Sequence, residues 1–153
     1  DLHEVKNGSL SLMHKLFPIG LLLLISSKWL YPLVFNTTFS ESYVYFNIYM
    51  LLMIPRLLFP HSVLLGLNRS KEIMMASIIE FVLNIVISLV LLQFIGLQGI
   101  AYGTVIAFLV NKAILLSILK KEGIRPRDYI PLQQLTWYTL SLTGIFIIFT
   151  YFL

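Results

Sequence analysis

The chain has 153 residues, of which 58% are hydrophobic and only 12% are charged, whereas soluble proteins carry about 25% charged residues. The net charge of +4 does not predict a nucleic-acid partner, because the basic residues separate apolar runs instead of gathering on one polar face. The chain has no cysteine, which excludes disulfides, thiolate catalysis and thiolate metal sites. This composition is typical of an integral membrane protein.

Apolar stretches of spanning length fill most of the chain. A helix needs about 20 residues to cross a hydrocarbon core of roughly 30 Å, and the stretches show no alternation of the kind that a barrel strand requires. They predict an all-α, polytopic membrane helix bundle of about five transmembrane helices, forming a single membrane domain over residues 1–153. The expected spans are 16–34, 43–67, 73–95, 99–119 and 135–153.

Basic residues occur in every second connection between these stretches. The amino-terminal segment carries Lys6 and Lys15, and residues 68–72 and 120–128 also contain Lys and Arg. The connections at 36–41 and 93–98 contain none. Because cytoplasmic loops are enriched in Lys and Arg, we expect the amino end and the two basic connections to be cytoplasmic in a multi-pass protein.

The two ends of the sequence predict a fragment. The first residue is Asp1 instead of Met, and Leu153 follows directly on an apolar run. We therefore expect the sequence to be part of a longer protein.

The second apolar stretch contains a charged residue between two prolines. Pro55 and Pro60 each remove a backbone hydrogen bond and favour a kink, and Arg56 at that depth is costly unless it faces protein or a wet cavity. Two interpretations stay open: a cationic contact in a transport pathway, or an arginine that satisfies the carbonyls freed by the prolines. We expect the neighbouring His61 to be neutral and hydrogen-bonded.

The third and fourth stretches carry further polar residues. Glu80 and Asn84 are four residues apart and share a helical face. Glu80 could couple transport to protons or cations, or it could form an internal ion pair. Its expected partner is Lys112, since both lie 16 residues from Gly96 in the connecting turn and so at equal depth; Arg56 is the rival partner.

Small residues recur along the fourth stretch at Gly99, Gly103 and Ala107. This spacing is typical of a helix face that lets a neighbouring backbone approach closely in a membrane. No catalytic constellation, metal-ligand cluster or phosphate-binding loop is evident in the sequence. We therefore expect no catalytic residues, no metal and no cofactor, and a protein that is not an enzyme.

Two motifs resemble those of a transporter family. Residues 64–71, Leu-Leu-Gly-Leu-Asn-Arg-Ser-Lys, resemble the "Leu-x-Gly-x-x-Lys" helix exit of bacterial polysaccharide flippases. Asn84 followed by residues 96–101, Gly-Leu-Gln-Gly-Ile-Ala, is similar to that family's "Asn … Gly-x-x-Gly-Ala-Ala" hairpin, with Ile100 replacing the commoner Ala. The segments 28–35 and 41–43 resemble the interfacial stretch that precedes it. The likeness covers residues 16–119 and continues toward the end.

The resemblance is to the carboxyl-terminal lobe of O-antigen and teichoic-acid type exporters, in the superfamily of multidrug, oligosaccharidyl-lipid and polysaccharide exporters. It implies a partial lobe of a transporter with 12 to 14 helices in the bacterial cytoplasmic (inner) membrane. It also implies lipid-linked oligosaccharides, membrane lipids and the amino-terminal lobe of the same transporter as partners. The matching positions, Asn84, Gly96, Gly99 and Ala101, would shape the hairpin.

We expect, on this basis, part of a flippase for undecaprenyl-diphosphate-linked oligosaccharides in cell-surface polysaccharide biosynthesis. One alternative is a multidrug-type small-molecule antiporter of the same superfamily. Another is a membrane scaffold that only packs. A membrane transferase ranks third, because a catalytic set is missing. The cavity or ion-pair candidates are Arg56, Glu80, Asn84 and Lys112, and the helix-packing candidates are Gly96, Gly99, Gly103 and Ala107.

Overall fold

The computed structural model describes residues 2–152, except for the side chain of Thr37. All regular elements in this part of the chain are helical. They are α1 (Leu2–Val34), a 3-10 helix (Thr37–Ser42), α2 (Tyr43–Met50), α3 (Met53–Arg56), α4 (Pro60–Gly66), α5 (Ser70–Ile95), α6 (Gln98–Lys121), α7 (Pro126–Tyr129), α8 (Leu132–Ile147) and a closing π-helical turn (Ile148–Phe152).

Four of these helices are long and apolar enough to cross a membrane: α1, α5, α6 and α8 with its π-helical turn. The segments Thr38–Met50 and Met53–Gly66 together could form a fifth span, but they are bent by 46° with respect to each other. The expectation of an all-helical membrane protein with about five spans is confirmed at this level. The prolines of the stretch 43–67 favour a kink, and the structure divides this stretch into three short helices, α2, α3 and α4.

The other expected spans lie within longer helices. α1 begins already at Leu2, α5 begins at Ser70 and ends at Ile95 as expected, α6 extends the expected 99–119 at both ends, and α8 begins at Leu132. These extensions are polar or amphipathic turns at helix ends, which a search for apolar runs leaves out. The end of the predicted fifth span, Leu153, lies outside the described residues.

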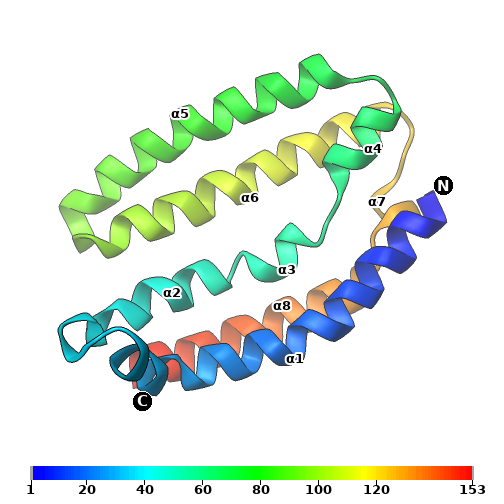
Figure 1. Ribbon diagram of the computed structural model, residues 1–153. Coiled ribbons are helices and arrows are strands. Elements are labelled where there is room, and N and C mark those ends of the chain that lie inside the picture. The colour runs from blue at the N-terminus through cyan, green and yellow to red at the C-terminus, as the bar shows by residue number, and fades with distance from the viewer. Residues whose placement is uncertain (1, 153) are drawn as a thin grey trace.

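The helices lie roughly side by side, as Figure 1 shows, with α5 and α6 forming an antiparallel hairpin and α1 pairing with α8. The broken segment α2–α3–α4 lies between these two pairs, and α4 leans toward the hairpin. The first residues of α1, the α4–α5 connection and the α6–α7 connection all lie at one end of the bundle (Figure 1). We call this the basic end, because these segments carry most of the Lys and Arg residues.

The buried core lies where α1, the broken segment, α6 and α8 meet, and its central side chains are Met13, Leu24, Ile48, Leu52, Ile54, Leu64, Leu115, Leu119 and Leu142. α5 contributes little to this core. Its apolar side chains are mostly exposed, as expected of a helix that faces lipid on most of its surface. The core therefore places the broken segment, and not the hairpin, at the centre of the described bundle.

Candidate functional site

The break in the second span follows from its two prolines. Proline has no backbone N–H, so Pro55 and Pro60 cannot donate to the carbonyls of Leu51 and Arg56 four residues earlier. α3 ends at Arg56, and α4 restarts with Pro60 in its first turn, a position where proline costs a helix little. Between them the chain leaves helical geometry at membrane depth, which is tolerated only where neighbours satisfy the freed backbone groups.

Side chains from two other helices bind backbone carbonyls in the non-helical turn between α3 and α4. The Ser9 hydroxyl on α1 donates to the Leu57 carbonyl at 2.7 Å. The Lys112 ammonium on α6 donates to the Leu58 carbonyl at 3.3 Å. Both donors are buried. α1 and α6 thus both bind the turn between α3 and α4. Among the described residues the Arg56 side chain forms no hydrogen bond, so it does not satisfy the carbonyls freed by the two prolines.

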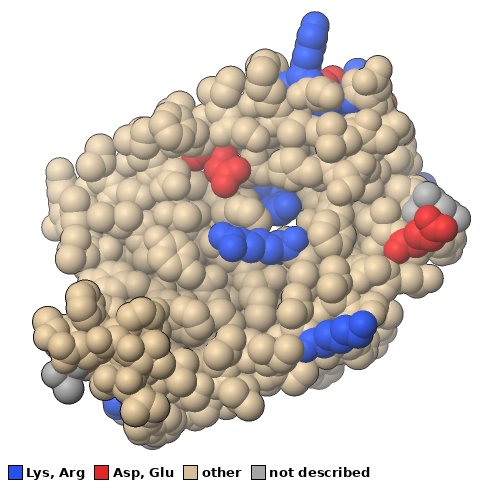
Figure 2. Space-filling view, in the orientation of Figure 1, with Lys and Arg blue, Asp and Glu red and all other residues tan. Residues whose placement is uncertain are grey.

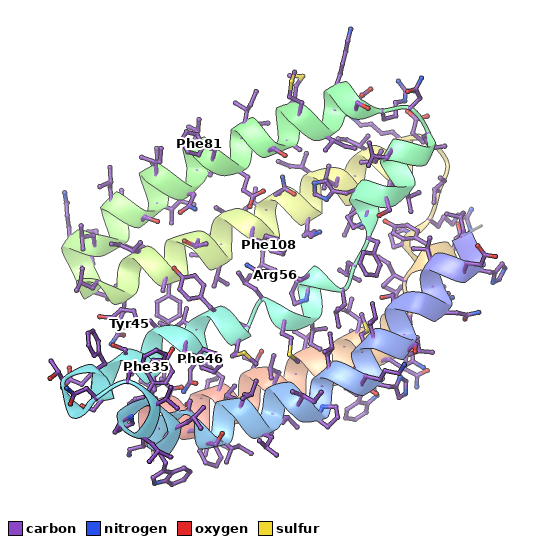
Figure 3. The ribbon with its side chains drawn as sticks, viewed as in Figure 1. Phe35, Tyr45, Phe46, Arg56, Phe81 and Phe108 are labelled. Carbon is purple, nitrogen blue, oxygen red and sulfur yellow. The ribbon has the colours of Figure 1, made fainter. Side chains whose placement is uncertain are left out.

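Arg56 instead lies over an aromatic ring. Its guanidinium carbon is 5.7 Å from the centroid of Phe108, and the Lys112 nitrogen is 5.0 Å from the same centroid. Figure 3 shows Arg56 on α3 beside Phe108 on α6. The negative face of an aromatic ring attracts cations, so Phe108 partly compensates two positive charges that repel each other.

Glu80 on α5 belongs to the same group of charges. Its carboxylate interacts electrostatically with Lys112, and His61 on α4 lies close enough to Lys112 to be repelled by it. The expected direct ion pair between Glu80 and Lys112 is not formed, since among the described atoms these two do not approach within 4 Å. The broken segment explains the difference, because it offers Lys112 a carbonyl as a hydrogen-bond acceptor.

Figure 2 shows acidic and basic side chains gathered around a hollow near the middle of this face, over α3, α5 and α6, with mostly uncharged residues around them. We call this the charged hollow and define it by Arg56, Glu80 and Lys112. Arg56 is exposed to it, Glu80 is half-buried, and Lys112 is only 8% exposed. Three candidates from three separate stretches of sequence are thus brought together.

Asn84 does not join this group. Its side-chain oxygen accepts hydrogen bonds from Ser88 at 3.0 Å and from Thr104 at 3.3 Å. The bond from Thr104 connects α5 with α6 inside the hairpin, whereas the bond from Ser88 lies within α5. Asn84 and Ser88 also border a groove of about 320 Å³ along the hairpin, which Phe81 and Ile100 line as well. Asn84 therefore acts in this structure as a hydrogen-bond acceptor between two packed helices.

The small residues of α6 face α5 at close range. A Cβ atom built on Gly103 would lie 2.8 Å from the Cα atom of Ser88, and one built on Gly99 would lie 2.6 Å from the backbone nitrogen of Leu92. Ala107, one turn further on, is fully buried. A Cβ atom built on Gly96 would have no neighbour within 4 Å. Gly96 nevertheless adopts φ +65° and ψ −151° at the end of α5, a conformation that residues with a side chain strongly disfavour.

Sequence reasoning assigned no role to two amides that the structure buries, Asn47 and Asn111. Asn47 is fully buried; it accepts from the Ser27 hydroxyl at 2.8 Å and donates to the Thr150 hydroxyl at 3.2 Å, which joins α1, α2 and the closing turn. Asn111 on α6 is 1% exposed, and both polar atoms of its side chain lack a hydrogen-bond partner among the described atoms. The available signal was an asparagine inside an apolar run, where polar side chains are costly and usually have a role.

The basic end holds its own polar contacts. Arg69 binds Glu122 at 2.6 Å and Glu72 at 3.1 Å, which joins the start of α5 to the end of α6. The hydrogen bond to Glu122 raises the pKa of Arg69 above its already high usual value.

Tyr129 on α7 is 1% exposed, and its hydroxyl has no partner among the described residues. Burial raises the pKa of this phenol to about 12.

Within the described residues, no group of three or more His, Asp or Glu side chains is arranged to hold a metal ion. The arrangement of charges suits the binding of a charged group inside a membrane, where Arg and Lys compensate negative charge. Comparisons with family models, curated proteins and solved structures find no match.

Proposed function

We propose that this chain is part of a membrane flippase that exports undecaprenyl-diphosphate-linked oligosaccharides for cell-surface polysaccharide biosynthesis. The observation that carries the proposal is the charged hollow, in which Arg56 from the broken segment and Lys112 from α6 stand over one ring at membrane depth. Ionisable residues inside a membrane most often mark a substrate or ion pathway. Two cations match the charge of a diphosphate group.

The short helices of the broken segment support the proposal that this segment moves during transport. Short helices separated by non-helical turns absorb backbone rotation at few positions, as alternating access requires. The bonds that attach the break to α1 and α6 come from the side chains of Ser9 and Lys112. Such contacts can exchange without disrupting a helix, so the hollow can open while the α5–α6 hairpin stays intact.

The test is export by the full-length protein that contains this chain, expressed in a flippase-null strain. Arg56→Gln should lower polysaccharide export at least about tenfold at unchanged membrane abundance, since a charge-assisted contact to phosphate is lost. Lys15→Gln, an exposed basic residue on α1, is the matched control and should export normally. Equal export by both variants would contradict the proposal.

The alternative of a small-molecule antiporter is favoured by Glu80, which faces the charged hollow without a hydrogen-bond partner among the described residues. A carboxylate in such a place is suited to proton or cation coupling. The antiporter predicts resistance to cationic dyes that Glu80→Gln abolishes, with no effect on glycan export. A scaffold predicts that neither dye resistance nor glycan export depends on Arg56 or Glu80.

A further inference from the structure

A second basic hollow lies at the basic end, away from the proposed transport site. It has a volume of about 350 Å³ and is lined by Lys120 at the end of α6, by Arg125, Pro126 and Arg127 around α7, and by Leu132 at the start of α8. Three cationic side chains thus border one space whose remaining walls are apolar. The hollow lies between the end of α6 and the start of α8, where we expect these two spans to leave the membrane.

The acidic residues next to this hollow are engaged elsewhere. Glu122 binds Arg69 at 2.6 Å, on the side of the α5–α6 hairpin. Asp128 accepts a hydrogen bond from the backbone N–H of Arg125 at 2.9 Å and so caps α7. Among the described residues, no acidic side chain forms an ion pair with Lys120, Arg125 or Arg127. The hollow therefore keeps an excess of positive charge.

The backbone that presents these side chains is held in place. Lys6 of α1 donates to the Arg127 carbonyl at 2.7 Å, and the Ile130 N–H donates to the Pro126 carbonyl at 2.8 Å. Tyr129 and Ile130 anchor the segment with side chains that are 1% and 2% exposed. The arginines therefore project from a fixed turn, which lowers the cost of ordering them around a ligand.

We propose that this hollow binds the phosphate headgroup of an anionic phospholipid from the leaflet at the basic end. Arginine forks match phosphate oxygens in pairs, and Lys120 adds a third positive charge. Leu132 and Pro126 offer an apolar surface for the glycerol and the first acyl carbons. Basic pockets between transmembrane helices are typical sites for such headgroups. The site is separate from the proposed transport function and does not depend on it.

The experiment measures lipid binding to the purified full-length protein in neutral detergent by native mass spectrometry, with phosphatidylglycerol and phosphatidylcholine as probes. The double variant Arg125→Gln/Arg127→Gln should bind phosphatidylglycerol roughly 25-fold more weakly, about fivefold for each cation. Lys121→Gln is the matched control: it removes the same charge one residue from Lys120, outside the hollow. It should weaken binding less than about twofold.

An equal loss in Lys121→Gln would show a diffuse surface potential and overturn the proposal. Equal binding of phosphatidylcholine to the unaltered protein would do the same. Displacement of phosphatidylglycerol by an equal concentration of glycerol phosphate would identify a site for free phosphates instead of a lipid. Helical content and elution volume are measured for each variant as a check of folding. If the double variant does not fold, Lys120→Gln replaces it: this substitution removes one charge of the hollow outside the α7 turn, and its phosphatidylglycerol binding is compared with that of Lys121→Gln.

Discussion

The α5–α6 hairpin and the broken segment α2–α3–α4 cross the same bundle by different means. In the hairpin, two unbroken helices approach through Gly99 and Gly103, and each helix satisfies its own backbone. In the broken segment, the chain leaves helical geometry between α3 and α4, and side chains of other helices bind the Leu57 and Leu58 carbonyls there. The two helices of the hairpin are held by close backbone packing, whereas the turn inside the broken segment is held by exchangeable hydrogen bonds. We infer that the hairpin is the rigid unit and the broken segment the movable one.

The largest effect is expected for Gly103→Leu, which tests the packing of the hairpin. Its side chain would overlap the backbone of Ser88, and overpacking of this kind should cost about 3 kcal/mol or more in the free energy of unfolding. Gly144→Leu on α8 is the control, because a Cβ there meets nothing within 4 Å. Unfolding in mixed micelles measures both. Similar stabilities would show that the hairpin tolerates separation and is not held by its shape.

Lys112→Met tests the broken segment from the α6 side. It leaves the Leu58 carbonyl without its donor, which should cost about 2 kcal/mol, part of the penalty being offset by removal of a buried charge. Lys15→Met on the exposed side of α1 should change stability by less than about 0.5 kcal/mol. A stabilised Lys112→Met variant would mean that burial of the charge outweighs the hydrogen bond.

The same variant sharpens the assignment of Glu80. A double-mutant cycle of Glu80→Gln with Lys112→Met should give a coupling energy below about 1 kcal/mol, because the two groups interact without direct contact. A coupling above about 2 kcal/mol would indicate a direct ion pair between Glu80 and Lys112, and would contradict the description of the charged hollow given above.

Ser9→Ala tests the break from the α1 side. Loss of the 2.7 Å bond to the Leu57 carbonyl should cost about 1 kcal/mol. The control is Ser117→Ala, whose hydroxyl only binds the Ala113 carbonyl of its own helix, and it should have little effect. If the two substitutions lower the free energy of unfolding equally, the hydrogen bond from Ser9 to the Leu57 carbonyl does not stabilise the break.

The smallest expected effect lies outside both regions, at Tyr129. Tyr129→Phe removes a buried hydroxyl without a described partner and should stabilise the protein by up to about 1 kcal/mol. The folded protein keeps the phenol protonated up to a pKa of about 12, whereas the unfolded chain ionises near 10. Stability should therefore fall between pH 10 and 12, less so in the variant. Difference absorbance at 295 nm between the two proteins should show one phenol titrating near 12.

Sequence reasoning worked where a property is local. Apolar length predicted the spans, and the spacing of Gly99, Gly103 and Ala107 predicted a small face on α6 that the structure turns toward α5. It failed where the outcome depends on partners distant in sequence. Nothing in residues 43–67 indicates that Ser9 and Lys112 would bind the Leu57 and Leu58 carbonyls, and without that help a single kinked helix is the simpler expectation. The Glu80–Lys112 pair failed for the same reason, because equal depth does not fix which acceptor the ammonium binds.

The tight turn at Gly96 has a consequence for how the protein is made. α5 is the most apolar helix and ends in a turn of only two residues before α6 begins. α6 carries Lys112 and would enter a membrane less readily by itself. Because the turn between them is so short, the two helices should enter the membrane together as one unit. The favourable insertion of the apolar α5 then offsets the unfavourable insertion of α6. Lengthening this turn with a polar linker should leave α6 outside the membrane in newly made chains, which a glycosylation-site reporter placed after residue 121 would detect.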